Sequence, residues 1–157
     1  MTMQTPHPLI IRDVAAGDFA GWQTLWDGYN AFYGRTGATA LPIDTTRLTW
    51  QRFLDPDEPM HALVAESRGA VAGLAHIVFH RSTTLPTQTC YLQDLFTAPE
   101  LRGQGVGRRL IEAVYDRARA QGAARVYWQT RQTNVTAMRL YDQVAEHSGF
   151  IVYRKVL

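Results

Sequence analysis

The sequence holds a single cysteine, Cys90, and no apolar run that approaches the roughly 18 residues of a membrane-spanning helix. One cysteine excludes an internal disulfide framework and is typical of a reducing cytosol, so we expect a cytoplasmic protein with no membrane contact. Charge is also scarce, because charged residues make up 19% of the chain and the formal net charge is only +2. This balance provides no concentrated basic face for nucleic acid.

The chain also lacks the ligand pattern of a metal site. Its five histidines have no metal-ligand spacing, and one cysteine cannot complete a zinc site, so we expect no metal. With 157 residues, of which 46% are apolar, the chain can bury a core without disulfides or metals. We expect a single domain over residues 1–157 that begins with a loose lead-in at residues 1–8.

Apolar periodicity predicts an α+β protein. The predicted elements are strands at 9–14, 61–67, 70–80, 90–97, 124–131 and 151–156, and helices at 18–33, 44–55, 106–121 and 134–147. Arg68 and Gly69 predict a tight hairpin between the second and third strands. Asp44 and Asn134 are predicted helix caps. The order favours antiparallel strands in the first half and a parallel strand–helix–strand unit in the second.

Residues 102–108 (Arg-Gly-Gln-Gly-Val-Gly-Arg) join a predicted strand to a predicted helix. Glycines at alternate positions let backbone N–H groups approach a ligand without an intervening Cβ. The helix start adds unpaired N–H donors and the positive end of the helix dipole. This segment therefore predicts a cradle for a phosphate or pyrophosphate group.

Two common phosphate-binding loops lack a required residue here. A P-loop ends in Lys followed by Ser or Thr, and Arg108 and Arg109 occupy those positions. A dinucleotide-binding loop needs an acidic residue about twenty positions further on, and residues 122–125 contain none. The remaining candidate is the pattern Arg-x-x-Gly-x-Gly, formed by Arg102, Gly105 and Gly107.

This third pattern resembles the acetyl-CoA site of the GCN5-related N-acetyltransferases (GNAT). A second motif, Asn134-x-x-Ala137-x-x-Leu140-Tyr141, is similar to a later signature of that family. The resemblance extends from about residue 9 to residue 156. It is closest to the small polyamine- and histone-type acetyltransferases, whose segments are echoed at 26–29 and 91–96.

The resemblance implies a GNAT fold, with a mixed central sheet of six to seven strands flanked by about four helices. The sheet would be splayed between its fourth and fifth strands, and acetyl-CoA would lie in that wedge. The implied acetyl-CoA contacts come from the strand, the loop and the last helix: Leu95, Phe96, Thr97, Arg102, Gly103, Gln104, Gly105, Val106, Gly107, Arg108, Asn134 and Tyr141. Arg102 either steadies the loop or contacts a phosphate.

The implied reaction is direct attack of a neutral amine on the thioester carbonyl. The backbone N–H of Leu95 is the implied oxyanion donor, and Tyr141 is the expected general acid for the leaving thiolate. Asn134 and Tyr141 share one helix face because they recur at helical spacing. A packing role for Tyr141 and a simple capping role for Asn134 are the alternatives.

Asp94 lies inside an otherwise apolar predicted strand, where an unpaired carboxylate is costly. It is a candidate to accept the amine proton through water or to bind a cationic amine, and the alternative is a structural partner for a backbone amide or an arginine. Polyamine-type relatives often carry Glu just before this Asp, whereas this chain has Gln93. An amide is no useful base, so water-mediated deprotonation is the alternative route.

The acceptor pocket is expected at the first two helices. Trp26, Tyr29 and Tyr33 follow helical spacing, which indicates either core packing or the wall of an apolar or cation–π pocket. Trp128, with Gln93 and Asp94, is expected to complete the substrate site.

We therefore expect an acetyl-CoA-dependent N-acetyltransferase that acts on a small-molecule primary amine: a polyamine, an amino acid or an amino sugar. The alternatives are a protein lysine or N-terminal acetyltransferase and a non-catalytic acyl-CoA-binding module. The last predicted strand, 151–156, stands where many family members carry a closing hairpin. Because an uncompleted sheet edge favours pairing with a second copy, we expect a homodimer.

Overall fold

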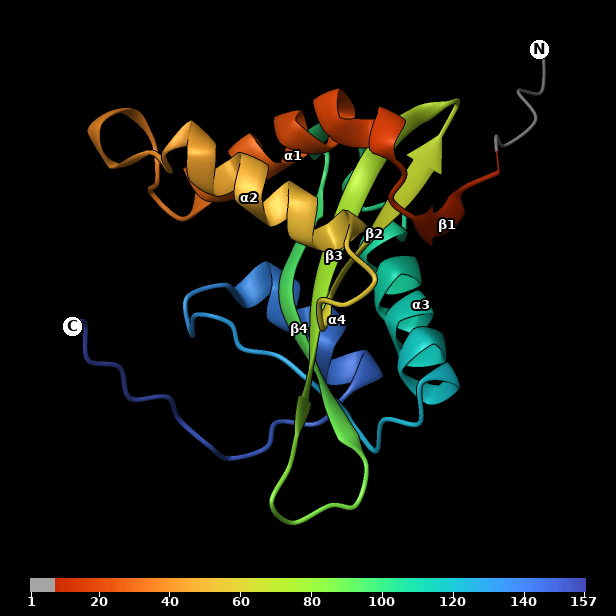
Figure 1. Cartoon of the computed structure of the whole chain (residues 1–157), viewed down its shortest axis with the longest axis vertical. Coiled ribbons are helices and arrows are strands. Elements are labelled where there is room, and N and C mark those ends of the chain that lie inside the picture. Colours follow the sequence, from red (N-terminus) through yellow and green to blue (C-terminus); the bar gives the residue numbers. More distant parts are fainter. Residues whose placement is uncertain (1–7) are drawn as a thin grey trace.

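A five-stranded sheet forms the centre of the computed structural model, which describes residues 8–157, so the predicted lead-in lies almost wholly outside the described residues. Its strands are arranged in chain order: β1 (Ile10–Asp13), β2 (Met60–Ser67), β3 (Ala70–Arg81), β4 (Gln88–Thr97) and β5 (Val126–Tyr127). The first four pair antiparallel, and β5 pairs parallel to β4. This confirms the α+β class and the mixed sheet (Figure 1).

Four α-helices cover the two faces of this sheet. They are α1 (Phe19–Phe32), α2 (Ile43–Leu54), α3 (Val106–Ala120) and α4 (Val135–Val144), with short 3-10 turns η1 (Ala16–Asp18), η2 (Gly37–Thr39) and η3 (Pro99–Leu101). Helices α1 and α2 lie on one face and α3 and α4 on the other (Figure 1). No helix in residues 8–157 is long and apolar enough to span a bilayer.

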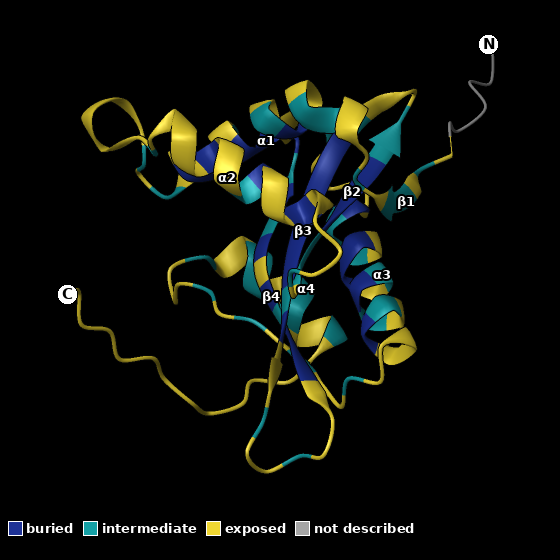
Figure 2. Ribbon diagram, in the orientation of Figure 1, coloured by how far each residue is buried: buried dark blue, intermediate teal, exposed yellow. Residues whose placement is uncertain are grey.

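Each face of the sheet has its own core. The α1 face buries aromatic side chains around Trp22, which is completely inaccessible. The α3 face is aliphatic, and there Leu110, Ile111 and Val114 are also completely inaccessible. Both cores contact β2, β3 and β4, which therefore form the buried centre of the sheet (Figure 2).

The antiparallel half follows the sequence prediction closely. Arg68 and Gly69, which join β2 to β3, have φ angles of +54° and +74°. Two consecutive positive φ angles are the mark of a type I′ turn, whose twist matches that of the flanking strands. The predicted hairpin is confirmed.

The parallel half departs from the prediction. Only Val126 and Tyr127 pair with β4, so the strand predicted over 124–131 is two residues long. The predicted strand 151–156 does not form, because this segment has no strand partner and is exposed along its whole length. Residues 8–157 thus contain five strands, and the expectation of six to seven was wrong.

Of the two predicted helix caps, Asn134 is confirmed in its position and Asp44 was wrong. Asp44 lies in the first turn of α2, after Pro42 at the cap position. Asn134 does occupy the cap position of α4, yet its side chain makes no capping bond. Its amide instead donates to the Thr130 hydroxyl at 3.1 Å, which fixes the chain that enters the helix.

Candidate active site

A β-bulge interrupts the middle of β4. Asp94 lies opposite His76, whereas the next pair joins Leu92 to Ile77, so Gln93 is an extra residue on β4. Residues two apart on a regular strand face the same side. The bulge instead places Leu92 in the α3-side core and turns Asp94 toward the α1 side, where it bonds His76.

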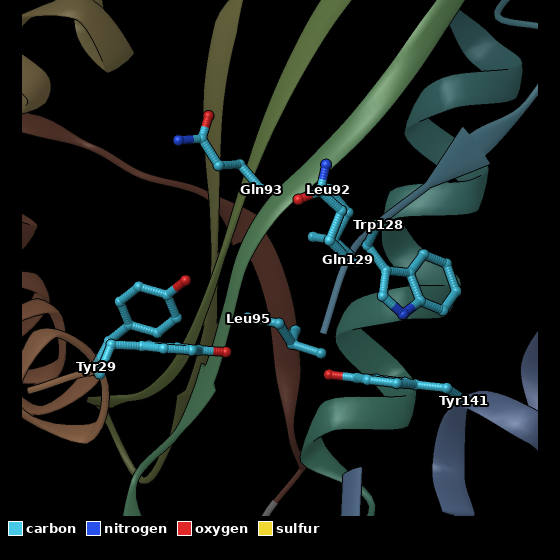
Figure 3. Close-up of a pocket in the computed structure, with 8 residues that line it drawn as sticks. Tyr29, Leu92, Gln93, Leu95, Trp128, Gln129 and Tyr141 are labelled. Carbon is cyan, nitrogen blue, oxygen red and sulfur yellow. The ribbon is translucent and has the colours of Figure 1, made fainter. Parts of the chain in front are cut away.

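The groove between β4 and β5 begins where their pairing stops, at Tyr91 and Tyr127. Within the described residues, β4 beyond Tyr91 has a strand partner only on its β3 side. Its other edge is therefore available to hydrogen-bond an extended ligand. The groove contains a cavity lined by Tyr29, Tyr33, Leu92, Gln93, Leu95, Trp128, Gln129 and Tyr141 (Figure 3).

Tyr141 projects from α4 and points its hydroxyl toward Leu95 (Figure 3). Its ring packs edge-on against Trp128, with the centroids 5.4 Å apart. Burial, with a smaller effect of the nearby Tyr33, raises the pKa of Tyr141 to about 12. The phenol therefore keeps its proton at neutral pH and is available as a proton donor.

The glycine segment turns sharply into α3. Gly103 and Gly105 have φ angles of +75° and +83°, in the left-handed region that is costly for residues with a Cβ. Arg109 donates its backbone N–H to the Gly105 carbonyl at 3.1 Å, which begins the helical hydrogen-bond pattern. The N–H groups of the three helical residues before Arg109 precede this pattern and have no helical acceptor.

Two arginines tie this segment to both sides of the groove. Arg102 donates from Nε to the Thr97 carbonyl at 3.3 Å, and its guanidinium lies 5.2 Å from the centre of the Phe96 ring. Arg108 donates to the side-chain oxygen of Gln143 on α4. The contacts of Arg102 match the loop-steadying alternative of the two roles predicted for it.

A second cavity, of about 410 Å³, lies on the α1 side of β4. It is lined by Trp26, Tyr29, Asn30, Arg35, Leu41, Tyr91, Gln93 and Asp94. Tyr29 and Gln93 also line the groove cavity, so the two cavities adjoin along these residues. A molecule in the second cavity therefore has access to the groove beside the bulge.

A chain of hydrogen bonds holds Asp94 at the wall of the second cavity. The Trp22 indole Nε1–H donates to His76 Nε2 at 2.9 Å, and His76 Nδ1 lies 2.9 Å from Asp94 Oδ2. Because an indole N–H can only donate, Nε2 is the acceptor, and the ring carries its proton on Nδ1. His76 therefore donates to the Asp94 carboxylate and fixes its orientation.

Tyr29 lies beside this carboxylate. Burial and then the adjacent Asp94 raise the pKa of Tyr29, so its hydroxyl remains protonated. Its ring is 8% exposed and stacks on Trp26 at 5.3 Å. The aromatic side chains of α1 therefore pack in the core and also line the second cavity.

Comparison with known proteins decides the family. A model of the Acetyltransferase (GNAT) family matches residues 22–145 of the chain. The chain belongs to this family.

Similarity to individual GNAT proteins covers most of the chain. It is 31% identical over 149 residues to a D-amino-acid N-acetyltransferase from Saccharomyces cerevisiae, covering 94% of this chain and 90% of that one. It is 34% identical over 107 residues to a thialysine N-epsilon-acetyltransferase from Bos taurus, covering 60% and 62%. The protein is therefore an N-acetyltransferase, and its relatives include thialysine enzymes.

The solved structures show the same fold. An aminoglycoside N-acetyltransferase in complex with the bisubstrate analogue CoA-S-monomethyl-acetylneamine superposes with a TM-score of 0.79. The match covers 96% of this chain and 99% of that chain at 19% identity. GNAT acetyltransferases use acetyl-CoA as the acetyl donor, and the open edge of β4 and the glycine segment have the chemistry that this donor requires.

The GNAT fold brings together most residues predicted for the site. Leu95 and Tyr141 meet at the groove cavity, as do Tyr29, Tyr33, Gln93 and Trp128. Trp26 and Asp94 line the second cavity. The remaining predicted contacts, Phe96, Thr97, residues 102–108 and Asn134, lie along the end of β4, the glycine segment and the start of α4.

Four residues of the second cavity, Asn30, Arg35, Leu41 and Tyr91, and His76 behind it were not predicted from the sequence. The sequence pattern did not mark Arg35 and Asn30 at the end of α1 as site residues, although Gly34 indicated that the helix ends there. Gly34 has a φ of +79°, and Arg35 donates its N–H to the Asn30 carbonyl at 2.8 Å, which folds Arg35 back over the helix end. Tyr91 and the buried His76 had no recognisable signal, because their roles depend on pairing across the sheet.

Asp94 also has a different partner from the expected one. The structural alternative was a backbone amide or an arginine, and the observed partner is His76. No group of three or more His, Cys, Asp or Glu side chains within residues 8–157 is arranged to hold a metal ion.

Proposed function

We propose that the protein transfers the acetyl group of acetyl-CoA to a primary amine of a small molecule, with Tyr141 as the general acid. One observation carries the proposal: the Tyr141 hydroxyl faces Leu95 across a cavity that opens where β4 and β5 part. The open edge of β4 would hold the pantetheine arm. The glycine segment, residues 103–108, would hold the pyrophosphate.

The reaction needs three contributions from the protein: stabilisation of the oxyanion, protonation of the leaving thiolate and removal of protons from the amine. The attacking nitrogen forms a bond to the thioester carbonyl carbon, and the Leu95 N–H would stabilise the oxyanion that develops. The C–S bond then breaks, and the leaving thiolate takes a proton from the Tyr141 hydroxyl. An acceptor that enters as an ammonium must lose two protons, one before it attacks and one as the amide forms. Water beside Asp94 would carry them away, because the amide of Gln93 cannot accept them, and a proton from water would restore the Tyr141 hydroxyl.

The acceptor would enter through the second cavity. Asp94 supplies a negative charge that attracts an ammonium group, and aromatic walls from Trp26, Tyr29 and Tyr91 suit a cationic or apolar substituent. Three of the similar proteins are named for small-molecule amines, namely D-amino acids, thialysine and aminoglycosides. These names support a small-molecule acceptor over a protein.

The decisive assay follows thiol release from acetyl-CoA with a panel of small amines, a lysine-containing peptide and a buffer blank. We expect turnover with small amines. Tyr141→Phe should lower kcat by about 100-fold, because a positioned general acid contributes about 10²–10⁴-fold.

The matched control is Tyr127→Phe, which removes a hydroxyl that hydrogen-bonds His80 Nε2 at 2.7 Å outside the groove cavity. CoA affinity should stay within about threefold of the wild type for both variants, since neither loses a hydrogen bond to the backbone. CoA binding without turnover on any amine would leave a non-catalytic module. Turnover on the peptide alone would favour a protein acetyltransferase.

A further inference from the structure

The second cavity contains two opposite charges that do not neutralise each other. Arg35 forms no salt bridge with a carboxylate anywhere in residues 8–157. Asp94 contacts the His76 ring and has the Tyr29 hydroxyl beside it, but it pairs with no arginine or lysine in the same residues. Both nevertheless line the same cavity of about 410 Å³. A binding site with one open cation and one open anion is complementary to a molecule that carries both charges.

Arg35 is held in place rather than free to move in solvent. Its Nε donates to the Asn30 side-chain oxygen at 2.6 Å. Asn30 is only 4% exposed, and its amide donates in turn to the Trp26 carbonyl at 2.9 Å. The guanidinium also lies 5.8 Å and 5.6 Å from the ring centres of Tyr29 and Tyr33.

The bond to Asn30 uses only the Nε–H of Arg35. The terminal nitrogens of the guanidinium have no hydrogen-bond acceptor among residues 8–157. A guanidinium whose fork is oriented in this way is suited to bind a carboxylate through two hydrogen bonds.

Asp94, which also lines this cavity, is held by hydrogen bonds as well. The His76 ring occupies Oδ2, and the indole of Trp22 holds the ring from behind. The carboxylate is thus presented at a fixed place beside the bulge, where the second cavity adjoins the groove. An ammonium group on Asp94 would lie next to Leu95, the neighbouring residue on β4.

We propose that the acceptor is a free amino acid, with its amino group at Asp94 and its carboxylate at Arg35. This deepens the proposed function and rests on it. A polyamine or an aminoglycoside would place a second cation near Arg35, which is unfavourable. A lysine within a protein has no free carboxylate to offer. Trp26, Leu41 and Tyr91 provide apolar and aromatic surface for the amino-acid side chain.

The test compares amino acids with amines that lack only the carboxylate. Thiol release is measured for both enantiomers of phenylalanine against phenethylamine, and for leucine against 3-methylbutylamine and lysine against cadaverine. We expect at least one amino acid to exceed its amine partner in kcat/KM. Arg35→Gln should lower the amino-acid-to-amine ratio of kcat/KM by at least about 10-fold, because a lost hydrogen bond to a charged group costs about 1.5–3 kcal/mol.

Two further variants separate binding from folding. Arg35→Lys keeps the charge but loses the fork, so it should restore part of the ratio. Arg119→Gln removes an exposed arginine that pairs with Asp116 on α3, and it should leave the ratio unchanged. A second readout is tryptophan fluorescence of the CoA-saturated enzyme titrated with the preferred amino acid, whose Kd should rise in Arg35→Gln and not in Arg119→Gln.

The outcomes are distinct. Turnover of amines without preference for any amino acid, or an Arg35→Gln ratio equal to that of the wild type, would overturn the inference and leave the proposed function standing. Absence of thiol release with every amine and amino acid would remove the proposed function itself. A lowered ratio with unchanged CoA affinity would establish the carboxylate site.

Discussion

The chain before Ala118 and the chain after it are built differently. Every buried residue in the described part of the chain lies at or before Ala118, and α4 has none (Figure 2). The C-terminal segment is almost bare, with Phe150 87% and Tyr153 89% exposed. The N-terminal region, with the sheet from β1 to β4 and helices α1 to α3, therefore has its own core, and the C-terminal region is added to it.

The C-terminal region is joined to the rest at the edge of the groove. Tyr115 donates to the Val144 carbonyl at 2.8 Å, and the Arg131 guanidinium lies 5.0 Å from the centre of the Tyr33 ring. Arg108 bonds Gln143 on α4. The groove thus has one wall fixed by the core and a second wall held by a few polar and aromatic contacts.

The largest effect should come from a cavity in the N-terminal core. Leu74 on β3 is completely buried, so Leu74→Ala should lower the free energy of unfolding by about 2–5 kcal/mol. Val135→Ala, at a position 56% exposed on α4, should change it by less than about 0.5 kcal/mol. Urea unfolding measures both. Equal losses would mean that the C-terminal region has a core of its own in solution, and the contrast between the regions would fail.

The same contrast explains how much of the fold the sequence could predict. The N-terminal elements have local signals: the apolar stripe of α1, the Arg68–Gly69 turn and the continuous apolar runs of β2 and β3. Periodicity reports burial on one face, so it succeeds where a core exists. Residues 124–131 and 151–156 have strand-like composition, but a strand also needs a partner, and composition does not supply one.

The candidate site is divided in the same way, into residues that sequence motifs predict and residues whose roles depend on strand pairing. The glycine segment and Tyr141 lie within short motifs, and their positions were predictable from the resemblance. The bond between His76 and Asp94 depends on the register of β3 and β4 and on the extra residue at the bulge. Such a pairing joins residues 18 apart through strand geometry, and no single-sequence pattern specifies it.

A smaller effect should come from the exposed C-terminal segment. The homodimer was expected from the edge of a strand at 151–156, and that strand does not form. The exposed apolar side chains of this segment and the free edge of β5 still favour association with a second copy, so the dimer stays a prediction. Light scattering at tens of micromolar should give a mass twice that of the 17.7 kDa chain. Tyr153→Asp should weaken this dimer by about 10-fold or more, since burying an unpaired charge is costly.

Gln121→Asp is the matched control, because it adds the same charge at an exposed position after α3. Its dimer should remain as stable as that of the wild type. A wild-type protein that stays monomeric at this concentration would show that the segment is covered in some other way or not at all.

The smallest effect concerns the pH dependence that follows from the burial of Tyr141, a side chain of the C-terminal region. Tyr141 has a pKa raised to about 12, against about 10 for an ordinary tyrosine. Its acid form is the active one, so its contribution to kcat should stay constant up to about pH 10.5 and fall only as the pH approaches 12. A wild-type kcat that declines with a midpoint near pH 10, in a way that Tyr141→Phe abolishes, would show that water reaches the phenol. In that case the second wall of the groove is open in solution. A kcat that stays constant up to about pH 10.5 would mean that both walls of the groove exclude water from Tyr141, although only the β4 wall is part of a core.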